Sequence, residues 1–66
     1  MAAHKWKWWA GPEGGKFTRG PFERKSQALA ALNEMGGGRI IEVQEGLNPN
    51  APLFQAEKRN LEYYND

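Results

Sequence analysis

The sequence predicts a small α+β domain in which a three-stranded antiparallel sheet packs on one helix, with elements in the order strand, strand, helix, strand (ββαβ). Three observations predict this class. Lys and Trp alternate near the start, apolar residues recur at helical spacing in the middle, and a run of β-branched residues follows three glycines. The 66 residues make one domain. We expect a core at 4–45, and a connector and C-terminal arm or short helix at 46–66.

The first strand is expected at 4–10, where the three tryptophans are divided between two faces. Successive side chains of an extended chain point to opposite sides. Trp6 and Trp8 therefore share one face, and Trp9 lies on the other face with Lys7. This pattern predicts a sheet strand with bulky rings both inside and outside the domain.

A hairpin is expected to return the chain. The segment 11–15 contains Gly and Pro residues that suit a tight reversal. The returning strand is expected at 16–20, and Pro21 ends it because proline cannot donate a hydrogen bond to a neighbouring strand.

A helix of about three turns is expected next, because apolar side chains fall on one helical stripe. Either Arg24 or Ser26 is expected at the cap position, and the glycines at 36–38 end the helix. The stripe is expected to cover the indoles of Trp6 or Trp8 and the side chains of the third strand. Its members are Ala28, Leu29, Leu32 and Met35.

The third strand is expected at 39–45, with Ile41 and Val43 on the face covered by the helix. The last segment, 53–64, has apolar residues at helical spacing and Asn50 as a possible cap. A helix this short is marginal in isolation. The alternatives are a short helix docked on the sheet, a loose tail, or an arm exchanged between two copies in a homodimer.

Composition and charge bear on the function class. The net charge is only +1, but 1–25 contain six basic and two acidic residues, whereas 26–66 contain three basic and six acidic ones. The absence of cysteine favours the cytoplasm over a secreted, disulfide-stapled domain. A membrane partner is not expected, because no apolar run is long enough to span a bilayer.

Enzymatic chemistry is not expected, and the predicted catalytic, cofactor and metal residues are none. The only histidine, His4, has no second histidine or cysteine to share a metal ion. The only serine, Ser26, has no base near it in the sequence and belongs to a helix start. The glycines at 36–38 follow a helix, so they do not form a phosphate-binding loop.

Part of the chain resembles two known classes. The stretch Gly20, Pro21, Phe22, followed by a helix, glycines and a β-branched strand, resembles half of a SPOR-like βαβ repeat, a peptidoglycan-binding module. The size and layout of 4–45 resemble very short bacteriophage and prophage proteins of ββαβ order that inhibit host proteins. The second resemblance implies a host protein as partner, in the cytoplasm of a bacterial cell.

Aromatic and basic side chains gathered on the hairpin favour a binding surface, since exposed Trp and Arg are frequent at interface hot spots. The leading hypothesis is a non-catalytic protein that binds, and modulates or inhibits, a host protein. The alternatives are single-stranded nucleic-acid binding by the same surface and a virion or structural component. The expected contact residues are Lys7, Trp9, Phe17 and Arg19, with Tyr63 and Tyr64 as a second patch.

Overall fold

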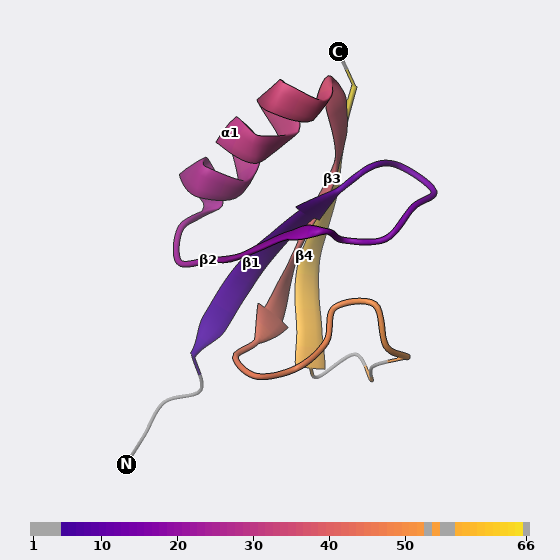
Figure 1. Cartoon of the computed structure of the whole chain (residues 1–66). Helices are drawn as coiled ribbons and strands as arrows, with labels where there is room; N and C mark the ends of the chain where they lie inside the picture. Colours follow the sequence, from indigo (N-terminus) through magenta and orange to yellow (C-terminus); the bar gives the residue numbers. More distant parts are fainter. Residues whose placement is uncertain (1–4, 53, 55–56, 66) are drawn as a thin grey trace.

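The computed structural model describes residues 5–52, 54 and 57–65, and in them one helix packs on a four-stranded antiparallel sheet (Figure 1). The strands lie in the order β2-β1-β3-β4, and every neighbouring pair is antiparallel. This confirms the α+β class and the order of the first four elements. The bounds are β1 Trp6–Gly11, β2 Arg19–Phe22, α1 Lys25–Met35, β3 Gly37–Gln44 and β4 Lys58–Asn65.

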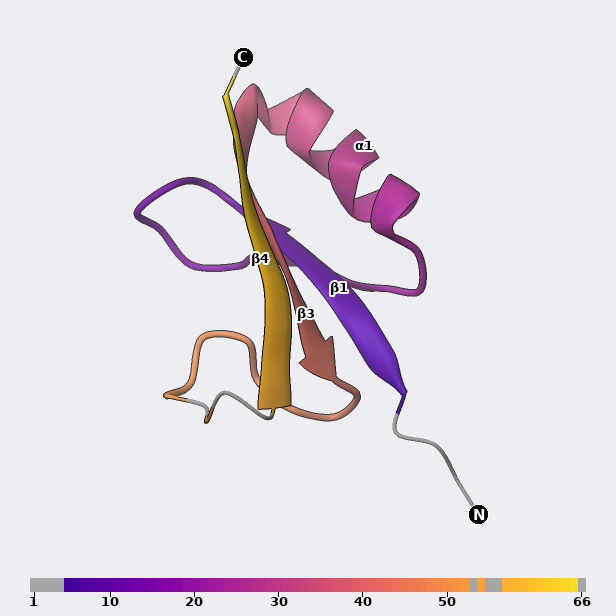
Figure 2. The same ribbon diagram turned by 180° about the vertical axis from the view of Figure 1, so that it is seen from behind.

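The two faces of the sheet have different cover. In Figures 1 and 2, α1 lies on one side of the sheet, and the loops that follow β1 and β3 extend to the other side. We call these sides the helical face and the distal face. Because neighbouring side chains of a strand alternate between faces, each residue of β1 and β3 is assigned to one of them.

The helical face carries the larger core cluster. Trp8, Ala10 and Ile40 point from β1 and β3 toward α1, where small side chains let the helix approach the Trp8 indole. The buried helix residues are Ala28, Ala31 and Leu32, and the partly buried residues packed around the cluster are Phe22, Leu29, Met35 and Tyr64. The predicted apolar stripe of the helix is therefore used for packing.

A second cluster lies on the distal face. Phe17, Ile41 and Val43 are buried there, and Trp9 and Leu47 pack against them. The adjacent indoles of Trp8 and Trp9 thus point to opposite faces, as the alternation predicts. The expectation that the helix covers Ile41 and Val43 is wrong, because Ile40 takes the position facing the helix and shifts these two side chains to the other side.

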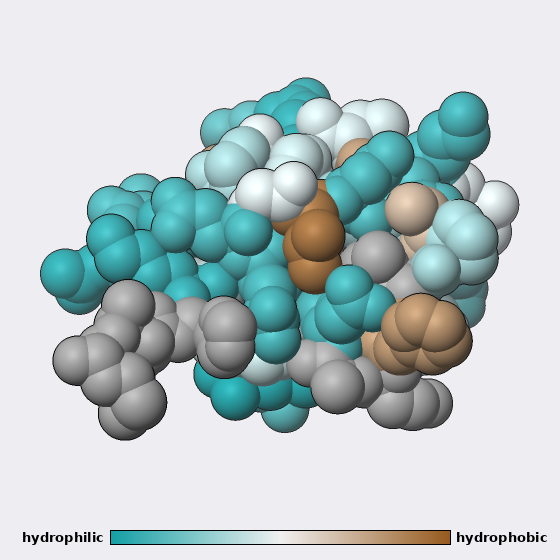
Figure 3. All heavy atoms as spheres, turned by 90° about the horizontal axis from the view of Figure 1, so that it is seen from below, coloured by the Kyte–Doolittle hydropathy of each residue, from teal (hydrophilic) through white to brown (hydrophobic). Residues whose placement is uncertain are grey.

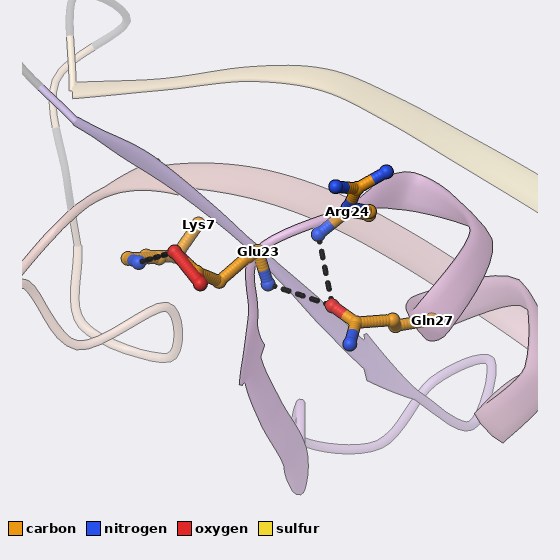
Figure 4. Close-up of polar contacts among 4 residues, drawn as sticks. All are labelled: Lys7, Glu23, Arg24 and Gln27. Atoms are coloured by element: carbon orange, nitrogen blue, oxygen red, sulfur yellow. Dashed lines mark hydrogen bonds and ion pairs between the residues drawn. The ribbon is translucent and has the colours of Figure 1, made fainter.

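Arg24 occupies the cap position of α1, and the side chain of Gln27 completes the helix start. The Gln27 carboxamide oxygen accepts hydrogen bonds from the backbone N–H groups of Glu23 and Arg24, each at 3.0 Å (Figure 4). Gly36 ends the helix in the left-handed conformation, with φ of 80°. Of the two predicted cap positions, Arg24 rather than Ser26 is the observed one.

The expected C-terminal tail or short helix is wrong for the described residues, because Lys58–Asn65 forms the fourth strand. The expected helix also included Leu53, Gln55 and Ala56, which lie outside the described residues, as does His4.

The pairing of β3 with β4 shifts between Ile40 and Glu42, where Asn60 has a φ of 55°. This irregularity is a β-bulge, which breaks the alternation that marks a strand.

The second strand begins later than expected. It covers Arg19–Phe22, with the Gly20–Pro21 peptide bond in the cis form. The preceding residues 16–18 belong to the loop from β1. Pro21 is tolerated because β2 is the outer strand of the sheet.

Candidate functional site on the distal face

The first feature of the distal face is a hollow of about 370 Å³ beside Trp9, which we call the Trp9 hollow. Lys7 and Trp9 of β1 form one wall, and Pro21 of β2 lies beside them. The opposite wall comes from the end of β3 and the loop after it, with Leu47 and Pro49 as its apolar members. A half-buried indole among prolines and a leucine offers a seat for one large apolar side chain.

The backbone of β2 packs against one face of the Trp9 ring at Gly20. A Cβ atom added at Gly20 would lie 2.8 Å from Cε3 of Trp9, so only glycine lets the two strands approach this closely. One face of the indole is thereby covered. The ring is fixed in place and is not presented as a free stacking surface.

A second hollow, of about 420 Å³, lies across β3 and β4, and we call it the basic hollow. Three cationic residues line it, Lys16 from the first loop, Arg39 from β3 and Lys58 from β4, and none of its lining residues is acidic. Leu61 of β4 and Ile41 of β3 contribute apolar surface. The combination suits a ligand that carries negative charge and some apolar contact area.

Arg39 is held in place by neutral groups. Its guanidinium lies 4.3 Å from the centre of the Phe17 ring and donates hydrogen bonds to the backbone carbonyls of Pro12 and Gly15. None of these partners carries a negative charge. Among the described residues, the Arg39 guanidinium is therefore oriented by neutral groups and forms no ion pair.

The two hollows meet at Pro49, which is buried and lines both. The loop is fixed there by Asn50. Its side-chain oxygen accepts a hydrogen bond from the Phe17 N–H at 2.7 Å, and its amide nitrogen donates to the Phe17 carbonyl at 3.1 Å. The Asn50 side chain thus pairs with Phe17 as a neighbouring strand would, and it ties the loop after β3 to the loop after β1.

The three cations of the basic hollow form no ion pair in the described part of the chain, and neither do Lys5 and Arg24. The ion pairs found in the described part of the chain join Lys7 with Glu23, Arg19 with Glu34, Lys25 with Glu62, and Arg59 with Glu42. None of these pairs includes a lining residue of the basic hollow. Within the described residues, the basic hollow therefore gathers three cations and no acidic lining residue.

The structure separates the predicted contact residues into two groups. Lys7 and Trp9 lie together on the distal face, and Tyr63, which is 57% exposed, shares that face because it lies opposite Arg39. The side chain of Lys7 is only 15% exposed and reaches Glu23 at 3.0 Å (Figure 4). These three remain candidates for partner contact.

The other predicted contact residues lie elsewhere. Phe17 is 6% exposed and belongs to the distal core, because Asn50 holds its backbone and Arg39 covers its ring. Arg19 points to the helical face, where it pairs with Glu34. Tyr64 packs against the helical core. The expected patch of Lys7, Trp9, Phe17 and Arg19 is therefore divided, and so is the expected second patch of Tyr63 and Tyr64.

The three cations of the basic hollow were not among the predicted contact residues. Arg39 precedes Ile41 and Val43 by two and four residues in the same strand. The alternation of the strand therefore already placed all three side chains on one face of the sheet. The face of Lys58 could not be predicted in this way, because Lys58 belongs to β4. The apolar residues of 53–64 fall at helical spacing, so this segment was expected to be a helix and not a strand. Lys16 was recognised as basic but not as part of a hollow.

At the start of α1, on the helical face, a separate polar cluster joins the helix to β4. Lys25 lies 2.9 Å from a Glu62 carboxylate oxygen, and the Tyr64 hydroxyl donates a hydrogen bond to the same carboxylate. The Tyr64 hydrogen bond and then the Lys25 hydrogen bond hold the pKa of Glu62 below its ordinary value of 4.5. The Glu62 carboxylate in turn raises the pKa values of Lys25 and Tyr64.

This cluster predicts a shifted titration. Because the pKa of Glu62 is lowered in the folded protein, its contribution to stability is present above the ordinary carboxyl pKa and is lost as the pH falls. Carbon-detected NMR should find the Glu62 midpoint below 4.5 in the native chain. Tyr64→Phe should raise the midpoint, and Lys25→Met should raise it less. An unchanged midpoint in both variants would contradict the assigned cause.

The described residues contain no group of three His, Cys, Asp or Glu side chains placed to hold a metal ion. Within the same residues, no helix has the length and apolar character needed to cross a membrane. The surface seen from below in Figure 3 is mainly hydrophilic, with small separate hydrophobic areas.

Comparison of the chain with models of protein families, with curated proteins and with solved structures found no match.

Proposed function

We propose that this chain is a non-catalytic binding protein that recognises another protein through the distal face, with the Trp9 hollow as its main contact. The observation that carries the proposal is the half-buried Trp9 indole, fixed by Gly20 on one side and facing a hollow with Leu47 and Pro49 on the other. Rigid aromatic walls around a small apolar hollow are typical of interface hot spots.

The ion pair beside the hollow supports the same function. Lys7 is held against Glu23, and this hydrogen bond lowers the pKa of the Glu23 carboxyl group. The Lys7 stem therefore forms a fixed part of the wall and does not sweep across the opening. A preorganised wall loses less conformational entropy when a partner binds.

As a short cysteine-free chain of phage-type layout, the protein is proposed to act in the cytoplasm of a bacterial host, where binding would modulate or inhibit a host protein. This part of the proposal depends on composition and on the ββαβ order of the first four elements. The bound partner, rather than a reaction at the distal face, supplies the biological effect.

The test is affinity purification from bacterial lysate with the native chain, Trp9→Phe and Trp9→Ala as baits. A protein retained by the native chain should be lost with Trp9→Ala, because truncating a hot-spot aromatic costs about 2 kcal/mol, or about thirtyfold in affinity. Trp9→Phe should weaken retention while keeping most of the packing against the distal core.

The matched control is Arg24→Ala, on the solvent side of the helix start (Figure 4). It should retain the same protein as the native chain. Circular dichroism of each bait checks that the fold is intact. If all baits retain the same proteins equally, the Trp9 hollow is not the contact surface.

A further inference from the structure

The basic hollow adds chemical information about the partner, and the inference drawn from it rests on the proposed function of the Trp9 hollow. The two hollows share Pro49 and open on the same face, so a segment seated in one passes directly to the other. Their linings differ. The Trp9 hollow combines apolar side chains with Lys7 and Glu45, which carry opposite charges, whereas the second hollow has three cationic residues and no acidic one.

From this arrangement we infer that the partner contributes an acidic segment whose large apolar side chain enters the Trp9 hollow and whose carboxylates enter the basic hollow. Charge complementarity carries the inference. Lys16, Arg39 and Lys58 converge without any acidic lining residue, and none of them belongs to an ion pair in the described part of the chain. Carboxylates of a partner would supply the missing charge.

The placement of Arg39 strengthens this assignment. Its guanidinium is anchored to the backbone carbonyls of Pro12 and Gly15 and lies over the Phe17 ring, so it is oriented before a ligand arrives. An oriented guanidinium loses little freedom on pairing with a carboxylate. The two lysines are free to adjust around it.

A protein segment fits the distal face better than nucleic acid does. Single-stranded nucleic acid needs a track of cations and free aromatic faces for base stacking. Here Lys16, Arg39 and Lys58 line one hollow, whereas Lys5 and Arg24, which also form no ion pair among the described residues, line neither hollow. The β2 backbone at Gly20 also covers one face of the Trp9 ring. The net charge of +1 also provides little general attraction for a polyanion.

The test uses the full chain and synthetic peptides with a leucine–phenylalanine pair followed by a run of glutamates. One matched peptide replaces the glutamates with lysines, and another replaces the apolar pair with alanines. Fluorescence anisotropy should detect binding of the acidic peptide, no binding of the basic one, and weaker binding as salt is raised, because screening reduces the attraction.

The double variant Lys16→Glu with Lys58→Glu should have an affinity for the acidic peptide at least about tenfold lower than that of the native chain. The control double variant, Lys5→Glu with Arg24→Glu, has the same change in net charge and should bind within about twofold of the native chain. Lys16 and Lys58 make no side-chain hydrogen bond or ion pair within the described residues, so the first variant should keep its fold.

The outcomes separate this inference from the proposed function. If the acidic and basic peptides bind equally, or both double variants bind alike, the acidic segment is excluded while dependence on Trp9 still supports the proposed function. If a single-stranded oligonucleotide displaces the acidic peptide at lower concentration than the peptide itself, the inference is overturned in favour of nucleic acid. If the alanine-substituted peptide binds as well as the parent, the proposed role of the Trp9 hollow fails.

Discussion

Gly38→Ala is expected to destabilise the domain by about 3 kcal/mol, from overpacking together with backbone strain. Gly38 has a φ of 144°, and a Cβ atom there would lie 2.3 Å from the Gly11 carbonyl oxygen and 3.1 Å from a Leu32 methyl carbon. The carbonyl belongs to the backbone of β1 and cannot move aside without disturbing the sheet. Thermal unfolding should show a midpoint lowered by roughly 15 °C, the scale for a chain of this size.

Gly46→Ala is the matched control for this substitution. Gly46 also has a positive φ, of 90°, but a Cβ atom there would meet nothing within 4 Å. Gly46→Ala should lower the free energy of unfolding by only about 1 kcal/mol, the cost of placing alanine in a left-handed conformation. Equal losses in the two variants would show that the close approach of β1 and β3 at Gly38 is not what the structure describes.

Asn50→Ala is expected to destabilise the domain by about 2 kcal/mol, because it leaves both backbone groups of Phe17 without their partner. The Asn50 side chain accepts from the Phe17 N–H and donates to the Phe17 carbonyl. Releasing this link should also loosen Pro49, which lines both hollows. Chemical denaturation should report the loss of stability, and amide exchange at Phe17 should accelerate.

Asn50→Asp separates the two hydrogen bonds. A carboxylate still accepts from the Phe17 N–H but cannot donate to its carbonyl, so the loss should be about half that of alanine. Affinity for the acidic peptide should fall with Asn50→Ala in parallel with the loosening of the loop. Full stability of Asn50→Ala would contradict the role assigned to this side chain.

The first strand, the helix and the third strand could be predicted because their patterns are local, whereas the second strand was expected at 16–20 and lies at Arg19–Phe22. Alternation placed Trp8 and Trp9 on opposite faces, and helical spacing with terminal glycines defined α1. The fourth strand could not be predicted, because Asn60 in a left-handed conformation adds a residue to β4 and breaks its alternation. With the added residue, Lys58 and Leu61 fall at the spacing of one side of a helix, so the sequence pattern favoured a helix here.

The positions of the proposed contact residues could be predicted only in part for a similar reason. Lys7 and Trp9 were identified from the alternation of β1. The burial of Phe17 depends on Asn50, which is distant in sequence, and the position of Lys58 depends on a strand pairing that local patterns do not specify. Long-range contacts, rather than residue types, decide which aromatic and basic side chains are available to a partner.

The most direct test of the distal face as the contact surface is an NMR titration of the three indole N–H signals with the acidic peptide. Trp8 lies in the helical core, and the Trp6 ring is stacked at 3.9 Å by the Arg59 guanidinium, so both belong to the helical face. The structure predicts that the Trp9 signal shifts while the other two remain in place. A shift of Trp6 or Trp8 with an unmoved Trp9 would contradict it.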